Sequence, residues 1–465
     1  MSYSGLTREL SKVREITFGT TPPAPSMKYV RALKNYDFGV SPGSIDSNEI
    51  KAHRMAMKSR NGNKKGQFSI PFELSYGAFD EMLEEVLCGT WSPVATCTVS
   101  LQVVASAKTF TRTVGSFLTD GFAVGQAIVT TGFTAPGDNS TFIISAVSAL
   151  IITCSTATGL VDEAAASRTI ATAAEKLRVG NTFRSSTFED RNPDANLYEQ
   201  YNGCVISSFD LDISPEKIVT GTFKGMARDC VVAGVSNAAI AVDSAAKTFT
   251  CAAGGFLSIG ASFAVGQGIV TTGFTTPANN GSFVISAVTD TVITCSAATG
   301  LVTEIAGTGK NVVLATLGAP AAAATNDPYD SYTGDINEGT TDQTEATGVK
   351  ISFDNSMKAT YVILTPGGDA ASSIKPDSQI KCTGDVSVFF ENLDFKKKFL
   401  AGQVSSLSVT LGTGLPGGKS IRLILPAIQY TDNKRTTDNT IVQTGNFKAN
   451  YDSVTATCIE IQRIP

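Results

Sequence analysis

The sequence predicts a mainly β protein in which one sheet-plus-helix domain, of the β-sandwich or β-barrel type, occurs twice and two small β modules are inserted. Three observations lead to this fold class. A strand followed by one short α-helix occurs in both halves of the chain, a second β-rich phrase recurs at a constant spacing, and only 17% of the 465 residues are charged. The abundance of small, β-tolerant and turn-forming residues favours sheets over helical bundles.

The strand-helix unit lies at residues 66–90 and again at residues 384–402. Apolar residues alternate from Phe68 to Phe72 and from Val386 to Phe390, as they do in a half-buried strand. An apolar helical face follows in both copies, and we expect Gly89 to end the first helix in the left-handed conformation. The predicted helix-core residues are Phe79, Met82, Leu83, Val86, Phe395 and Phe399.

A second, β-rich module is duplicated with an offset of 141 residues. Its clearest phrase is Phe122-Ala-Val-Gly-Gln126, which returns as Phe263-Ala-Val-Gly-Gln267, and three further phrases keep the same offset. Short β-rich runs alternate with glycine and asparagine turns, as in a small barrel or sandwich. We place the two modules at residues 97–174 and 231–316.

Removing the modules leaves two versions of one domain. The phrase Thr220-Gly-Thr-Phe-Lys224 has a counterpart in Thr444-Gly-Asn-Phe-Lys448, and each phrase follows a strand-helix unit. The first domain is therefore discontinuous, at residues 27–96 and 175–230, and opens with a strand from Tyr29 to Val40. The second domain covers residues 330–465, and residues 317–329 form a linker that is flexible by composition.

Two polar segments are candidates for contacts with a neighbouring subunit. Residues 1–26 end in a proline-rich stretch that favours an extended arm, which either drapes over a neighbour or is a disordered terminus. Residues 41–66 are a long, locally basic excursion, either a hairpin that reaches acidic groups of another subunit or a solvated loop. The charged residues of this excursion are Asp46, Glu49, Lys51, Arg54, Lys58, Arg60, Lys64 and Lys65.

The totals argue against several classes of protein. A net charge of −5 disfavours binding of nucleic acid through a basic patch, although it is compatible with a surface along which DNA slides. Nine cysteines stand well apart without a Cys-x-x-Cys pair, which predicts buried thiols rather than disulfides or a metal site. The N-terminus lacks a basic start followed by an apolar run, so we expect a soluble chain without a secretion signal.

No set of residues in the sequence suggests catalysis, a metal or a cofactor. His53 is the only histidine, whereas activated nucleophiles and catalytic metal sites commonly need a positioned histidine. The glycines form neither a phosphate-binding loop nor a dinucleotide fingerprint. We interpret Asp210 and Asp212 as the polar face of a strand whose other face is apolar. The chain is therefore not expected to be an enzyme.

A duplicated sheet domain, long polar hairpins and an extended arm together describe a self-assembling structural protein. Exposed strands and hairpins are natural joints between subunits. Two like domains in one chain can occupy equivalent places in a closed ring, so three chains would supply six pseudo-equivalent domains. If one half is peripheral, six chains would form the ring instead.

Three phrases of the sequence resemble the tail tube, or major tail, proteins of long, non-contractile-tailed bacteriophages of the siphophage type. These phrases are residues 72–91, 201–223 and 386–400, and the resemblance omits the two modules. It implies stacked rings of tail-tube-like domains whose inner sheets join into a barrel, with the helices outside. It also implies a virion tail protein that is made in the host bacterial cytoplasm and provides a channel for genome ejection.

The resemblance implies particular partners and surfaces. The homo-oligomeric tube would meet tail tip, terminator and tape measure proteins, and DNA would pass through it without specific binding or any membrane contact. Asp210 and Asp212 would face the lumen, because an acidic wall repels phosphates. The basic excursion would brace one ring to the next, and the two modules would decorate the outside, either to bind host surface sugars or to stiffen the tube.

Two other classes of protein fit parts of the sequence. A surface adhesin, a surface-layer protein or another virion decoration protein would also carry Thr- and Gly-rich β repeats, but an adhesin would need a secretion signal. A tail-associated hydrolase would need a clustered acid pair or a nucleophile in a cleft. Substitution of Asp210 or Asp212 would then abolish an activity.

Overall fold

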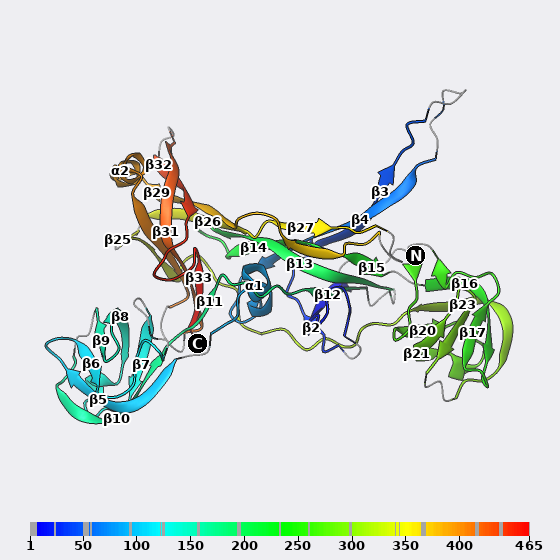
Figure 1. Cartoon of the computed structure of the whole chain (residues 1–465), viewed down its shortest axis with the longest axis horizontal. Helices are drawn as coiled ribbons and strands as arrows, with labels where there is room; N and C mark the ends of the chain where they lie inside the picture. The colour runs from blue at the N-terminus through cyan, green and yellow to red at the C-terminus, as the bar shows by residue number, and fades with distance from the viewer. Residues whose placement is uncertain are drawn as a thin grey trace.

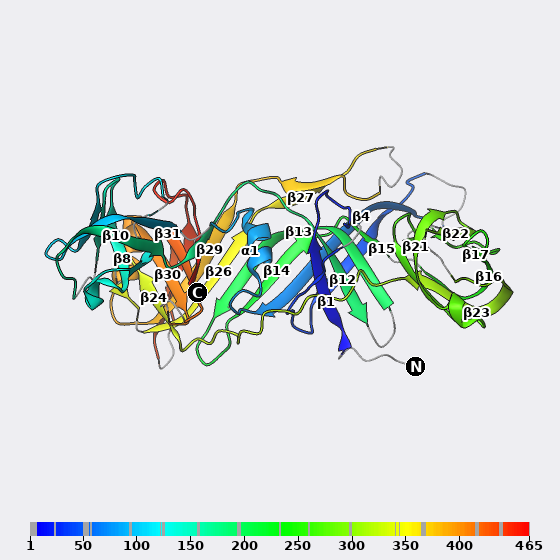
Figure 2. The same ribbon diagram turned by 90° about the horizontal axis from the view of Figure 1, so that it is seen from below.

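The two halves of the chain share one long sheet, and a small closed barrel lies at each end of the molecule (Figures 1 and 2). The computed structural model describes residues 7–464, except for 23–24, 50–54, 56–57, 93–94, 121, 123–125, 156–158, 193–196, 232–233, 259–260, 297–299, 340, 344, 364–368, 414–417 and 437–439. The predicted fold class is confirmed, since the described residues form two short α-helices, two closed six-stranded barrels and an extensive sheet.

The elements of the first half lie on both sides of the first barrel in the sequence. They are β1 (Glu9–Arg14), β2 (Lys28–Tyr29), β3 (Asp37–Ile45), β4 (Arg60–Glu73), α1 (Asp80–Leu87), β11 (Glu175–Arg178), β12 (Ser186–Asn192), β13 (Leu197–Ile213), β14 (Thr220–Met226) and β15 (Asp229–Val231).

The elements of the second half are continuous in the sequence. They are β24 (Gly334–Glu338), β25 (Thr341–Asp342), β26 (Ala346–Asp354), β27 (Met357–Thr360), β28 (Ser373–Pro376), β29 (Lys381–Phe389), α2 (Asp394–Ala401), β30 (Val404–Leu411), β31 (Ser420–Arg435), β32 (Val442–Ala449) and β33 (Glu460–Ile464).

The two halves repeat one order of strands. In the first half, β14 lies between β4 and β13, and β3 pairs with β4. In the second half, β32 lies between β29 and β31, and β26 pairs with β29. The order β3-β4-β14-β13 therefore corresponds to β26-β29-β32-β31, with the shared Thr-Gly-x-Phe-Lys phrase in β14 and β32.

Two antiparallel ladders join the halves: β11 pairs with β33, and the central ladder is formed by β13 and β26. Residues 208–213 of β13 pair with residues 349–354 of β26, so that Phe209 lies opposite Phe353. The rings of these two residues are stacked, with centroids 5.8 Å apart. One hydrophobic core consequently runs through both halves and includes Phe72, Phe209, Phe353 and Phe447.

Each helix covers the apolar face of its half. Phe79, Met82, Leu83 and Val86 of the α1 region are at most 5% exposed, and Phe79 packs on Phe72 and Phe223. In α2, Phe395 is buried against Tyr430 of β31, whereas Phe399 is only partly buried. The helix-core residues expected from the sequence thus lie on the sheet-facing side of both helices.

The end of α1 differs from the expectation. Cys88, not Gly89, adopts the left-handed conformation, with φ of 50°, while Gly402 does so after α2 with φ of 59°. Gly89 is needed for a different reason: a Cβ atom there would lie 2.1 Å from the carbonyl oxygen of Arg178. The glycine permits close approach of the β11 backbone rather than a positive φ.

Three segments differ from what the sequence predicts: the N-terminal arm, the first strand and the linker. Residues 9–14, within the expected arm, form β1, which pairs with β12 and β2. The expected strand from Tyr29 to Val40 is divided between β2 and β3 by a turn. The linker is held by hydrogen bonds, including Tyr29 N–H to Ala321 O at 3.1 Å and Asn326 Nδ2 to Tyr76 O at 2.8 Å.

The two barrels have cores of their own, separate from that of the sheet. The first comprises β5 (Thr96–Val104), β6 (Thr109–Arg112), β7 (Ala127–Thr131), β8 (Thr141–Val147), β9 (Ile151–Cys154) and β10 (Glu163–Thr172). The second comprises β16 (Gly234–Asp243), β17 (Thr248–Cys251), β20 (Gly268–Thr272), β21 (Gly281–Val288), β22 (Val292–Cys295) and β23 (Glu304–Leu314), with β18 (Leu257–Ser258) and β19 (Ala261–Ser262) as a small hairpin.

The barrels differ at one buried polar position next to a short 3₁₀ turn (Pro136–Asp138 and Pro277–Asn279). In the second barrel Asn279 Nδ2 donates to Glu304 Oε2 and to Val302 O, both at 2.9 Å. In the first barrel the counterpart is Asp138, which is fully buried and whose Oδ2 has no hydrogen-bond partner. Burial raises the pKa of Asp138 above its ordinary value, because the charged form is poorly solvated there.

This difference predicts that Asp138→Asn stabilises the first barrel. The folded state holds its proton on Asp138 at pH values where the unfolded chain has already lost it, so stability falls as the pH rises above about 4. An asparagine side chain does not titrate, so this pH-dependent loss of stability disappears, and its amide can donate the two hydrogen bonds that Asn279 Nδ2 donates. We expect a gain of about 1–3 kcal/mol near pH 7 that shrinks towards pH 4, measured by thermal unfolding. The matched change Asn279→Asp should destabilise the second barrel, and a pH-independent difference would contradict this account.

Candidate functional site

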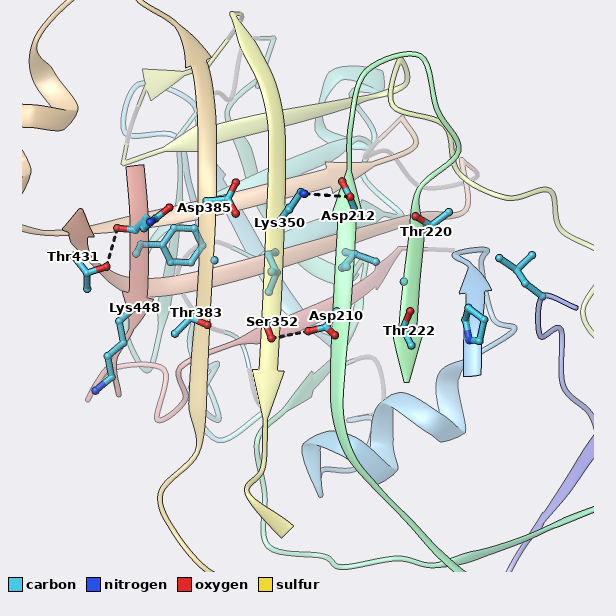
Figure 3. Close-up of a pocket in the computed structure, with 18 residues that line it drawn as sticks. Asp210, Asp212, Thr220, Thr222, Lys350, Ser352, Thr383, Asp385, Thr431 and Lys448 are labelled. Carbon is cyan, nitrogen blue, oxygen red and sulfur yellow. Dashed lines mark hydrogen bonds and ion pairs between the residues drawn. The ribbon is translucent and has the colours of Figure 1, made fainter. Parts of the chain in front are cut away.

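The outward face of the joined sheet is the candidate functional surface. A broad hollow crosses this face and is lined by residues of β14, β13, β26, β29 and β32, which come from both halves (Figure 3). The side chains alternate along each strand, so the face opposite the helices is polar. Its polar residues are Asp210, Asp212, Thr220, Thr222, Lys350, Ser352, Thr383, Asp385, Thr431, Asn446 and Lys448.

Polar contacts cross the ladder between the halves. Ser352 Oγ donates to Asp210 Oδ1 at 2.6 Å, and the Lys350 ammonium lies 3.6 Å from Asp212 Oδ2. Figure 3 shows both contacts bridging β13 and β26. Asp210 also accepts from Lys224 Nζ at 2.7 Å within the first half. The ladder that joins the halves is thus tied on its outward face by ionic and hydroxyl groups.

The face carries less negative charge than the sequence suggests. Asp210 and Asp212 lie on it as half-buried residues, but each has a lysine partner, and Asp432 on β31 is likewise paired with Lys434 at 2.8 Å. Burial raises the pKa of Asp385, which further disfavours negative charge at that position. The surface is therefore an array of close ion pairs and hydroxyl groups rather than a purely acidic wall.

The residues of the second half that complete this surface were not identified from the sequence. Residues 349–354, Val-Lys-Ile-Ser-Phe-Asp, alternate apolar and polar in the same way as residues 209–213. That period-two pattern is the signal that identifies Lys350 and Ser352 as outward-facing. Their proximity to Asp210 and Asp212 depends on the long-range β13–β26 pairing, which no local pattern specifies.

The basic excursion is a hairpin that projects beyond the sheet (Figure 1). Lys64 and Lys65 are in β4 and Arg60 is its first residue, while Asp46, Glu49 and Lys58 flank the two strands. Lys51, Arg54 and His53 lie outside the described residues. Lys64 is engaged within the chain, because its ammonium lies 2.9 Å from Asp229 and 3.4 Å from Asp369.

The described residues offer no constellation for redox or metal chemistry. No group of three or more His, Cys, Asp or Glu side chains among them could hold a metal ion. All nine cysteines are free thiols, and only Cys230 and Cys458 are not fully buried. None of the described helices has the length and apolar character needed to cross a membrane.

Substitutions in the β13–β26 ladder should lower the free energy of unfolding more when they remove a buried side chain than when they remove a surface ion pair. Phe353→Ala removes a fully buried ring from the β13–β26 ladder and should lower the free energy of unfolding by about 3–5 kcal/mol. Asp212→Asn removes an ion pair whose partners are 45% and 60% exposed, and should cost less than about 1 kcal/mol. Urea unfolding of the unassembled chain measures both, and comparable losses would show that the surface pair, not the core, holds the joint.

The chain was also compared with known proteins. A family model described as phage tail tube protein matches residues 5–286 and, a second time, residues 267–449. The search of curated proteins found no match. The two matches together span nearly the whole chain, and one match falls on each half.

Proposed function

We propose, from the premise that this chain belongs to the phage tail tube protein family, that three copies close into one ring of the tube. The chain is a structural component of a phage tail, and its family is not enzymatic. Members of this family act as oligomeric rings, so the open questions are how many copies form a ring and which surface lines it. The observation that carries our proposal is the ladder between β13 and β26.

The ladder uses one edge of each half and leaves the equivalent edges unpaired. In β31, the counterpart of β13, residues 430–435 pair with β32 on one side, whereas β30 on the other side reaches only Gln429. In β3, the counterpart of β26, pairing within the described residues is with β4 alone. An unpaired strand edge is a template for a neighbouring chain.

Joining these edges between copies would continue the pattern already present within the chain. The end of β31 in one copy would pair with β3 of the next, as β13 pairs with β26. Every half would then have equivalent neighbours, and three copies would give six pseudo-equivalent halves around a closed ring. A ring of six copies would require one half of each chain to lie outside the wall of the tube, although both halves have the same strand order.

We further propose that the outward polar face lines the channel. The helix α1 lies on the opposite side of the central strands, and most of each barrel lies on that side too (Figure 1). Asp210 and Asp212 would then face the lumen, each paired with a lysine. Paired charges attract phosphates weakly, so DNA would pass without adhering.

The remaining assignments follow from the phrases that resemble siphophage tubes. We propose a long, non-contractile tail in which the tube meets tail tip, terminator and tape measure proteins. The part of the β3–β4 hairpin from Asp46 to Arg60 is the candidate for the contact between stacked rings, because Lys64 is already paired within the chain. The two barrels would decorate the outside of the tube.

Electron microscopy of the assembled protein tests the ring. End-on averages should show a hollow tube with three-fold true symmetry and six-fold pseudo-symmetry, because each copy supplies two equivalent halves. True six-fold rings would contradict the equivalence of the halves while leaving the tube intact.

The proposed lining is tested by reversing its charge. Tubes of the double variant Asp210→Lys, Asp212→Lys should retain duplex DNA in co-sedimentation at about 50 mM salt and release it by about 200 mM, because phosphate contacts weaken steeply with salt. Wild-type tubes should retain little. Asp394→Lys, on the exposed side of α2, is the control. Equal retention by the control would place Asp210 and Asp212 outside the lumen.

A further inference from the structure

The last turn of α2 is bare, although its counterpart in α1 is covered. Leu400 is 73% exposed, whereas Val86, its counterpart in α1, is fully buried, and Val404 just after α2 is 56% exposed. The helices have the same length and both end in the left-handed conformation, so the positions correspond. The difference between Leu400 and its buried counterpart makes the end of α2 a candidate contact surface.

The cover over the end of α1 comes from the other half of the chain. Asn355, directly after β26, donates from Nδ2 to Val86 O at 3.3 Å and contacts Cys88 Sγ at 3.0 Å. Met357 and Ile374 of the β27–β28 hairpin then form an apolar cluster with Cys88. The segment that follows β26 of the second half therefore covers the end of α1 in the first half, with which β26 is paired through β13.

The corresponding segment of the first half is the base of the β3–β4 hairpin. Lys224 lies opposite Ser69 and Lys448 lies opposite Thr383, which makes Ser69 and Thr383 equivalent. Asp37 is opposite Ser69, and Ser352 is opposite Thr383, so these two residues also correspond. Counting three residues onward places Val40 at the position of Asn355.

This hairpin cannot reach α2 of its own chain. Figure 1 shows β3 and β4 projecting at the opposite end of the sheet from α2. Val40 is half-buried, and Pro42 and Ile45 further along the strand are exposed. The exposed end of α2 and the exposed hairpin residues Pro42 and Ile45 thus lie at opposite ends of the sheet (Figure 1).

We propose that Leu400 and Val404 are the docking site for the base of the β3–β4 hairpin, residues 40–45, of the next copy of this chain in the same ring. The inference rests on the proposed ring, since pairing of β31 with β3 brings the hairpin to this helix. The contact is lateral and apolar, and it is distinct from the contact that the hairpin tip makes with a stacked ring. The docked hairpin base covers the end of α2 as the β27–β28 hairpin covers the end of α1.

Disulfide trapping tests the contact directly. The double variant Pro42→Cys, Leu400→Cys should give chains linked to one another in isolated rings under mild oxidation, since both positions are exposed in the single chain. Each single variant is the control for links to the native cysteines. Links that form only when rings are stacked would overturn the lateral contact, as would their absence from rings with three-fold symmetry.

A charge substitution provides an independent measurement. Leu400→Lys should weaken ring association about tenfold, the factor that corresponds to burial of part of one leucine side chain, without changing the melting temperature of the unassembled chain. Leu393→Lys, at the other end of the helix and 44% exposed, should leave association unchanged. Normal rings of Leu400→Lys would refute the docking site but keep the ring. Wild-type protein without three-fold rings would refute the proposed ring itself, and the docking site with it.

Discussion

The ladder between β13 and β26 is the constraint on which the rest of the molecule depends. It joins the central strands of the two halves over one core, because Phe209 and Phe353 stack across it, while β11 and β33 join the halves a second time. It also removes two strand edges from solvent and leaves their two counterparts available. A sheet edge that cannot be paired or covered invites uncontrolled association. In the ring proposed above, these two counterpart edges would pair between copies in the same way as β13 and β26 pair within the chain.

The strict alternation along these strands separates stability from surface chemistry. Phe209, Phe223 and Phe353 face the helices and are buried, while their sequence neighbours face outward with hydroxyl and charged groups. Buried rings contribute several kcal/mol each, whereas exposed ion pairs contribute less than about 1 kcal/mol. Substitutions on the outward face therefore change its surface chemistry at little cost to the stability of the fold. Pairing each aspartate with a lysine keeps that face polar without a strong charge of either sign.

Local pattern was sufficient for the parts of the fold that depend on neighbours in the sequence. Alternation from Phe68 to Phe72, the apolar stripe of α1 and the exact spacing of the repeated modules all predict elements that the structure contains. Long-range pairing decided the rest. Residues 9–14 look like part of a polar arm, yet they form β1 because β12 offers an edge. Lys350 and Ser352 join Asp210 and Asp212 only through the ladder. The place of the left-handed residue also differs from the capping expectation: Cys88 adopts the positive φ, while Gly89 is required by the close β11 backbone.

The barrels show how an insertion can leave such an assembly undisturbed. The six main strands of each barrel close on one another around an aromatic core of their own, so within the described residues they offer no open sheet edge to compete with β3 or β31. Hydrogen bonds tie the segment after the second barrel to β13 and β12: Gln200 Nε2 donates to Ala315 O at 3.1 Å, and Leu317 N–H donates to Glu189 Oε1 at 2.7 Å. Because neither barrel shares the core of the sheet, its core sequence can change without disturbing the packing of the sheet. Asp138 and Arg168 in the first barrel stand where the second has Asn279 and Lys310, each pair beside an equivalent glutamate, and this divergence of buried residues is the kind that such independence permits.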